Sequence, residues 1–199
     1  MRLLVTALVV AAAAARLDAQ TVAAQPLPPR PYTFSVAGGT ALVTGEDRDY
    51  YSPGFHLQGG VGVALPARYR LSLRADAMYE RVPGRDRSTQ RFPGGPDTLL
   101  IGDMSVLSGT VSAVYHVGGM QRAVRPYVLF GPGLFRVEQE GVLYDQPVSG
   151  AQSRFGISAG GGVAFPVGPL AAFAEARVHN VFADGGSARL YPIVVGVQF

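Results

Sequence analysis

The chain lacks cysteine, tryptophan and lysine, and it carries little charge for its length. Without cysteine it has no disulfide framework, no thiol nucleophile and no cysteine-based zinc site. All 17 basic residues are arginine, and only 16% of residues are charged, where a water-soluble domain usually carries about a quarter. The net charge of +3 is too small and too scattered to predict a nucleic-acid partner.

A long apolar run is also missing, because no stretch reaches the roughly 20 residues that a membrane-spanning helix needs. The apolar segment Leu3–Ala15 is shorter, follows Arg2 and precedes small residues, which is typical of a cleavable signal peptide. We predict a signal peptide at 1–19, with cleavage after Ala19 or as late as Ala24. Residues 20–31 are rich in proline and predict an extended lead-in to a single domain at 32–199.

Apolar and polar residues alternate along eight segments of this domain, which predicts eight β-strands. The predicted strands are Tyr32–Thr44, Phe55–Leu65, Tyr69–Val82, Met104–Val117, Pro126–Val137, Arg154–Phe165, Leu170–Phe182 and Leu190–Phe199. Each is close to the ~9–11 residues of a tilted membrane strand.

The connections between these strands alternate in length. The longer, polar ones follow the odd-numbered strands and are Gly45–Gly54, Pro83–Asp103, Glu138–Ser153 and Ala183–Arg189. The others are Pro66–Arg68, Gly118–Arg125 and Pro166–Pro169. This pattern predicts loops at one end of a barrel, with turns and both termini at the other, although 118–125 is at least as long as 183–189.

The last strand carries an unbroken apolar face. Its members are Tyr191, Ile193, Val195, Val197 and Phe199. A water-soluble chain seldom ends this way, because terminal residues usually fray into solvent. A closed membrane barrel needs such a face against lipid, and its last strand must pair with its first to remove the sheet edge.

Charged side chains share one face of two predicted strands. Placing Arg74 in lipid at mid-depth would cost about 2–4 kcal/mol, so this face is predicted to point into the lumen. The predicted lumen network consists of Arg70, Arg74, Asp76, Glu80, Glu175, Arg177 and His179, with His56, Gln58 and Ser158 also inward. Glycine pairs at 60/62, 131/133 and 160/162 are predicted to leave room for large lumen side chains. The strand 126–137, with Pro132 at its centre, cannot be oriented from its pattern.

With these features the chain resembles the small eight-stranded outer-membrane β-barrels, namely the membrane domain of OmpA-type proteins and the OmpX/Ail-like surface proteins. The likeness is greatest at 175–179, Glu-Ala-Arg-Val-His, and at 194–199, Val-Val-Gly-Val-Gln-Phe. It implies an all-β fold, an eight-stranded antiparallel up-and-down transmembrane barrel preceded by a cleavable signal peptide, in the outer membrane of a diderm bacterium. It further implies that the apolar residues of the last strand are read by the β-barrel assembly machinery. The wall-tethering domain of full-length OmpA-type proteins has no counterpart before Phe199.

Two interpretations of the lumen charges are open. Buried charges must be paired, so arginines and acids together predict a salt-bridge plug that stiffens the barrel. Alternatively, they line a narrow gated channel for small solutes or ions and set its selectivity.

A lipid A-modifying enzyme is the less favoured alternative. The deacylase-like His-x-Ser-Asn arrangement is missing, since the chain reads His-Asn-Val-Phe at 179–182. Ser108, Ser112 and His116 share one strand face, a row that is more often packing than catalysis. We therefore expect no enzymatic activity, no cofactor and no metal site. A soluble lipocalin-like barrel is the alternative from a different class, and it would require the two strand faces to be reversed.

The loops supply the remaining candidates. Arg85, Arg87 and Arg91 lie in the longest loop and suit lipopolysaccharide phosphates, for which the planar guanidinium is well shaped. An ordinary solvated loop would look the same. The sequence thus predicts a monomer with a structural or surface-interaction role through extracellular loops, in contact with outer-membrane lipid and lipopolysaccharide.

Overall fold

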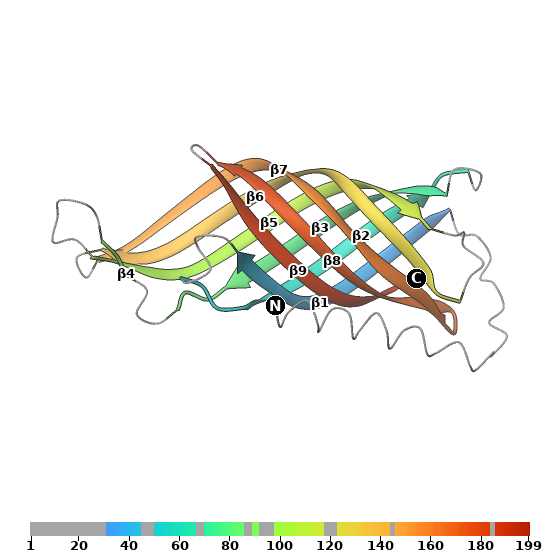
Figure 1. Cartoon of the computed structure of the whole chain (residues 1–199), viewed down its shortest axis with the longest axis horizontal. Coiled ribbons are helices and arrows are strands. Elements are labelled where there is room, and N and C mark those ends of the chain that lie inside the picture. The colour runs from blue at the N-terminus through green and yellow to red at the C-terminus, as the bar shows by residue number, and fades with distance from the viewer. Residues whose placement is uncertain are drawn as a thin grey trace.

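The computed structural model describes residues 31–44, 50–66, 70–85, 89–91, 98–117, 123–143, 146–183 and 186–199, which form an all-β structure (Figure 1). The strands are β1 (Tyr32–Thr44), β2 (Gly54–Ala64), β3 (Leu71–Val82), β4 (Thr89–Arg91), β5 (Thr98–His116), β6 (Arg125–Leu143), β7 (Gln146–Val167), β8 (Leu170–Ala183) and β9 (Gly186–Gln198). Within this part of the chain, no helix combines the length and apolarity of a membrane span. The predicted signal peptide, and the lead-in except for Pro31, lie outside the described residues.

Eight strands close into an antiparallel barrel, as the sequence predicts. Each strand pairs with the next along the chain, except that β3 pairs with β5 and the short β4 pairs only with β5. The ring closes between the first and last strands, where Val36 lies opposite Val197. Phe34 and Phe199 exchange backbone hydrogen bonds of 2.8 and 2.9 Å at the end of this seam. The last strand therefore has no open edge there.

Three strands extend well past the rest of the barrel. β5 and β6 each contain 19 residues and β7 contains 22, whereas β1, β2, β3, β8 and β9 contain 11 to 14. Figure 1 shows β5, β6 and β7 running out to the left, beyond the ends of β1 and β9. We call 98–103, 138–143 and 146–155 the extension.

The extension corrects one sequence prediction, because Glu138–Ser153 is not a loop. Its residues continue the β6–β7 ladder, with Glu138 opposite Ala151 and Leu143 opposite Gln146. Side chains at 138–140 and 149–153 are all exposed, so neither face of the sheet is buried there. Without a buried face the period-2 pattern disappears, and a polar strand looks like a loop. The predicted loop 83–103 likewise contains β4 and the first part of β5.

Successive side chains along each strand point alternately into the lumen and out from the barrel. Outward side chains are large and apolar around the wall, including Val36, Leu57, Leu73, Leu107, Phe130, Leu134, Phe155, Ile193 and Val195. Aromatic pairs lie near strand ends: Phe34 stacks on Phe199, and Phe155 stacks on Phe182. The apolar face of the last strand points outward as predicted, with Val195 67% exposed.

The structure orients β6, which the sequence left open. Tyr127, Leu129 and Phe135 are buried in the lumen, while Leu134 and Pro132 face outward. Pairing between β5 and β6 is interrupted at Pro132, with the same register on both sides of the gap. Proline has no N–H to donate, so Pro132 interrupts the ladder with β5, while the pairing with β7 continues beside it.

Buried apolar side chains form two layers inside the barrel, one toward each end. The layer toward the loops contains Ala41, Val82, Met104, Val106, Phe135, Val181 and Leu190. The layer toward the turns contains Val114, Tyr127, Leu129, Ala164, Phe173 and Val194. The buried charged residues lie between these two layers. Along the barrel axis, the lumen core is therefore apolar toward each end and charged in the middle.

Candidate functional site

Two strands on different sides of the barrel supply the central charges. β3 carries Arg74 and Asp76, and β8 carries Glu175 and Arg177, in each case two residues apart on the inward face. An arginine and an acid separated by two residues in a strand point the same way, because side chains alternate between faces. Since β3 and β8 are not neighbours in the sheet, contacts between them cross the lumen.

The four side chains form a closed ring of ion pairs. Arg74 donates to Asp76 at 3.0 Å and to Glu175 at 2.7 and 2.9 Å. Arg177 donates to Glu175 and to Asp76, each at 2.6 Å. Each carboxylate therefore contacts both guanidinium groups, and the two positive and two negative charges balance. All four residues are less than a tenth exposed.

Neutral side chains complete this ring. Tyr127 donates its hydroxyl to Glu175 at 2.7 Å, and Gln58 donates its amide to Asp76 at 3.2 Å. Thr110 accepts from Arg177 at 3.5 Å. Tyr127 and Thr110 were missed by sequence reasoning. Tyr127 lies on the strand that could not be oriented, and the outward position of Pro132, five residues along, is the signal that would have placed it inward.

A second polar group lies nearer the loops and involves Glu80, His56 and His179. His56 Nδ1 is 3.0 Å from Glu80 Oε1, and His179 Nε2 is 3.8 Å from the same oxygen. Phe135 packs beside His179 with ring centroids 5.3 Å apart. Glu80 Oε2, His56 Nε2 and both His179 nitrogens have no hydrogen-bond partner in the described part of the chain. Among the described residues, no three His, Asp or Glu side chains are grouped as a metal site.

One residue of the predicted network lies elsewhere. Arg70 is exposed, precedes β3 and has a φ of 52°, which places it in the turn rather than on the inward strand face. A positive φ is uncommon outside glycine and marks a chain reversal that ends the strand pattern. The other predicted members, Arg74, Asp76, Glu80, Glu175, Arg177 and His179, are all buried in the lumen.

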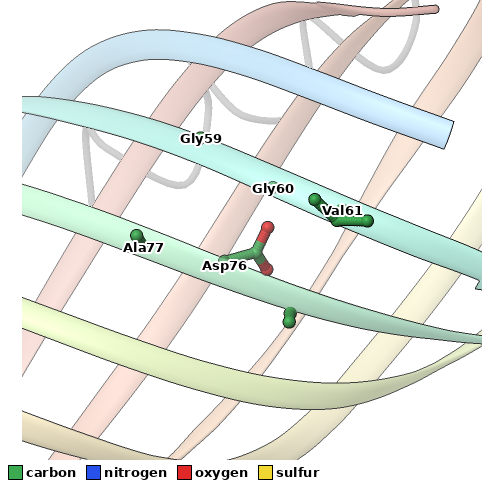
Figure 2. A pocket seen from close by; sticks show the side chains of 6 residues that line it. Gly59, Gly60, Val61, Asp76 and Ala77 are labelled. Atoms are coloured by element: carbon green, nitrogen blue, oxygen red, sulfur yellow. The ribbon is translucent and has the colours of Figure 1, made fainter.

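Inward glycines make room for the large lumen groups. A Cβ on Gly60 would overlap the Asp76 carboxylate and lie 2.8 Å from Ser35 Oγ, and Figure 2 shows Asp76 beside Gly60. A Cβ on Gly162 would lie 2.6 Å from the Tyr127 hydroxyl oxygen. By contrast, a Cβ on the outward Gly59 would meet nothing within 4 Å. The same close-up frames an open depression on the outer wall, which is lined by Gly59, Gly60, Val61, Ala75, Asp76 and Ala77.

The serine and histidine row on β5 is not assembled as a catalytic group. Ser108 and Ser112 are buried, and their hydroxyl oxygens have no partner among the residues that the structure describes. His116 lies 3.2 Å from Ser72 of the neighbouring strand β3, and no described acid hydrogen-bonds its other nitrogen. A nucleophile needs a base that is itself oriented by a third group, and that third group is missing among the described residues.

Most of the residues predicted to contact lipopolysaccharide lie outside the part of the chain that the structure describes. Arg87 is among the residues not described, and the same holds for the side chain of Arg91. Arg85 is exposed and donates to the Tyr51 carbonyl at 3.3 Å. Two further arginines face outward at the loop end of the wall, where Arg81 pairs with Asp103 and Arg136 pairs with Glu138, each at 2.9 Å.

Comparison with solved structures gives the same fold. Neisserial surface protein A (NspA) has a TM-score of 0.59 at 18% identity, over 85% of this chain and 96% of that one. A major outer membrane protein of Thermus thermophilus has a TM-score of 0.57 at 13% identity, over 85% and 99%. The outer membrane protein OprG of Pseudomonas aeruginosa has 0.52 at 14%, over 88% and 99%.

Neither a scan against protein-family models nor a search of curated proteins found a match. At the level of the fold, the likeness to small outer-membrane barrels that the sequence indicates is confirmed.

Proposed function

We propose that this chain is a monomeric outer-membrane protein with a rigid barrel, and that it acts through a surface interaction made by the extension. The single observation that carries the interaction is the free edge of β7. Pairing between β7 and β8 begins at Gly156, so residues 146–155 pair with β6 on one side and with no described strand on the other.

The location rests on the outer wall and on the fold. Large apolar side chains face outward from the barrel strands, and charged side chains of β3 and β8 face inward. In water this arrangement would expose the apolar groups and bury the charges, which is the reverse of a soluble barrel. The solved structures with this fold that carry a location in their names are outer-membrane proteins. Because the eight strands close on themselves, the sheet needs no second copy to complete it.

The free edge has the chemistry of a strand-binding surface. Exposed sheet edges in natural proteins are usually protected by charged residues, bulges or proline. Along the free edge the one charged residue is Arg154, at the barrel end, and the one proline is Pro147, near the tip. Residues 149–153, Ser-Gly-Ala-Gln-Ser, lie between them, are exposed and carry no charge. Unpaired backbone groups along such an edge can add an extended peptide as a further strand. We propose that the partner contributes such a segment.

Lipopolysaccharide is proposed as a second contact at the loop end of the wall. Arg81 and Arg136 face outward there, above the apolar wall, and both side chains remain about half exposed despite their acidic partners. A planar guanidinium can pair with a phosphate through two parallel hydrogen bonds. This contact would anchor the barrel among the lipids that surround the extension.

The edge is tested with a photo-crosslinking amino acid placed at Gln152 in intact cells. We expect a discrete protein adduct from Gln152, and only lipid adducts when the same probe replaces Leu134, which faces outward from the barrel wall. A shortened hairpin supplies the matched variant. Replacing 140–149 with Asn-Gly joins Gln139 to Gly150, which already face each other, through a two-residue turn.

The shortened variant should fold and give a weaker adduct from Gln152, because it removes residues 146–149 of the free edge. Folding is checked by heat-modifiable migration in gels. An adduct of unchanged yield in the shortened variant, or a Gln152 probe that captures only lipid, would contradict the proposed interaction.

The location is tested by protease treatment of intact cells. We expect cleavage in the connection between Arg85 and Thr98, whereas the paired part of the β6–β7 hairpin should resist. Complete protection of the chain on cells that carry folded barrel would count against the surface location.

A further inference from the structure

Charge is distributed unequally between the two ends of the barrel. In the sequence, the connections from β2 to β3, from β5 to β6 and from β7 to β8, taken with the first residue of β6, contain four arginines but no aspartate or glutamate, and the structure describes two of these arginines, Arg70 and Arg125. The nearest buried acids along the adjoining strands are Asp76 and Glu175, and both are engaged by Arg74 and Arg177. The positive charge at this end therefore has no acidic side chain left to neutralise it within the described residues.

Of the described arginines at this end, Arg125 lies on the inward face of the barrel and Arg70 is exposed in the turn. Arg125 is the first residue of β6 and shares the inward face with Tyr127 and Leu129, two and four residues along. Its Nε atom is buried and has no hydrogen-bond partner among the described residues. Buried donors are nearly always matched by a protein group or by an ordered molecule, so this nitrogen is free to meet an acceptor that enters the mouth.

Further hydrogen-bonding groups lie beside Arg125. The backbone bond from Val117 N to the Pro126 carbonyl, at 2.8 Å, joins the ends of β5 and β6 and brings His116 next to Tyr127. His116 Nε2 lies 3.2 Å from Ser72 Oγ, and the His116 backbone N donates to the Arg70 carbonyl at 2.9 Å. Ser72, His116 and Arg125 thus gather at one mouth, at the ends of three strands.

The barrel is closed behind this group. The buried layer around Tyr127, Leu129 and Phe173 follows directly inside the mouth, so the polar groups cannot continue into a conducting path. Because Ser72, His116 and Arg125 lie on inward strand faces, they are reached from the aqueous mouth rather than from the outer wall. A ligand for them enters from the turn end and stops there.

We propose that this mouth is an anion-binding site that takes a phosphate group, with Arg125 as its principal ligand and His116 and Ser72 beside it. A tetrahedral phosphate offers several acceptor oxygens, so it can engage donors that converge from different strands, whereas a planar carboxylate offers two. The phosphate belongs either to a free anion or to a lipid headgroup that bends into the mouth. If the loop end lies at the cell surface, as the proposed function has it, this end faces the periplasm. The binding itself does not rest on that location and is testable in micelles.

The first test uses purified barrel in dodecyl maltoside, a detergent without phosphate. Inorganic phosphate is titrated while its ³¹P linewidth is measured, and the unfolding midpoint is recorded with and without it. Arg125→Gln should weaken binding about tenfold or more, because a charged hydrogen-bond donor is lost. Arg189→Gln is the matched control, since it removes an exposed arginine at the opposite end of the barrel, where Arg189 donates to Asn180 at 3.4 Å. This control should bind phosphate like the wild type.

A second arm separates the two sources of phosphate. Micelles doped with dioleoyl phosphatidylglycerol are compared with free phosphate, and the Arg125-dependent rise in unfolding midpoint is measured in each. A rise with free phosphate supports a soluble anion, and a rise with the phospholipid alone supports a headgroup. His116→Asn provides a further variant in case Arg125→Gln does not fold, and it should weaken binding in the same arm.

The proposal is overturned if neither probe binds, or if Arg125→Gln and His116→Asn bind both probes as the wild type does. These outcomes are independent of the surface interaction, which concerns the opposite end of the barrel.

Discussion

At the scale of single residues, the central charges are stabilised by mutual neutralisation rather than by solvent. Asp76 and Glu175 each contact Arg74 and Arg177, so removing any one member leaves a buried charge without half of its partners. A buried ion pair adds little over an apolar core, but breaking one is costly. The ring of ion pairs therefore holds β3 and β8 in one position relative to each other across the lumen.

Arg177→Ala should lower the free energy of unfolding by about 3–5 kcal/mol, because Asp76 and Glu175 would remain buried with Arg74 alone. Arg136→Ala is a close control. It also removes an arginine that pairs with a glutamate two residues away in a strand, but both of those side chains are about half exposed. That change should cost less than about 1 kcal/mol. Unfolding in urea, with the barrel in micelles, measures the stability of both variants. Equal unfolding midpoints for the two variants would show that the ring of ion pairs does not stabilise the barrel.

Gly60→Ala should destabilise the barrel by about 1–3 kcal/mol, because the added methyl overlaps the Asp76 carboxylate and crowds Ser35. Gly59→Ala changes the neighbouring residue on the outer face, where the methyl meets nothing within 4 Å. The same urea titration should therefore separate two chemically identical substitutions. If Gly59→Ala proved as costly as Gly60→Ala, strand propensity rather than lumen space would explain the glycines.

At the scale of elements, the last strand is the clearest case of sequence pattern becoming structure. β9 pairs with β8 on one side and β1 on the other, so it both completes the wall and closes it. Its outward residues alternate with Leu190, Pro192 and Val194, which are buried in the lumen. A period of two with one buried face is enough to set which side of the strand faces lipid, and it excludes a slip of one residue.

Val195→Arg should prevent assembly, since this outward side chain lies opposite Gly38 and Ala174 in the middle of the wall. An arginine at mid-depth in lipid costs roughly 2–4 kcal/mol. Val195→Leu should assemble normally. The measurement is the amount of heat-modifiable barrel in the outer-membrane fraction, and wild-type amounts of the arginine variant would show that this face does not meet lipid.

The hairpin of β6 and β7 shows where element prediction fails. Inside the barrel, apolar alternation identifies both strands, but beyond it the exposed residues 149–153 carry no such pattern. Their strand structure comes from continuing an existing ladder, and each added pair only extends hydrogen bonding that the barrel has already begun. Strand residues that form by extending an existing ladder in this way show no characteristic sequence pattern.

At the scale of the whole molecule, the lumen is filled along its axis. The apolar layer at Val106 and Phe135 lies on one side of the charged residues, and the layer at Leu129 and Phe173 lies on the other. An ion crossing this path would pass through two apolar layers. The apolar side chains of these layers cannot replace the ion's hydration shell. The plug is therefore favoured over the channel.

Planar bilayers that contain the folded protein should show no discrete openings. A filled lumen of an eight-stranded barrel leaves no aqueous path, as small barrels are just wide enough for their own side chains. Reproducible openings that change with Glu175→Gln would instead show that ions pass the charged ring, and the plug would have to be abandoned.

The sequence alone determined the fold class, the strand count, the inward position of the β3 and β8 charges, and the outward face of the last strand. These follow from period-2 alternation, which is a local property. Only the tertiary structure decided that Arg74 reaches Glu175 across the barrel, that Tyr127 joins them and that Arg70 stays outside. Those facts depend on the register between strands and on a turn at positive φ. Register and closure bring together residues 101 positions apart, as with Arg74 and Glu175, and no local pattern specifies such a distance.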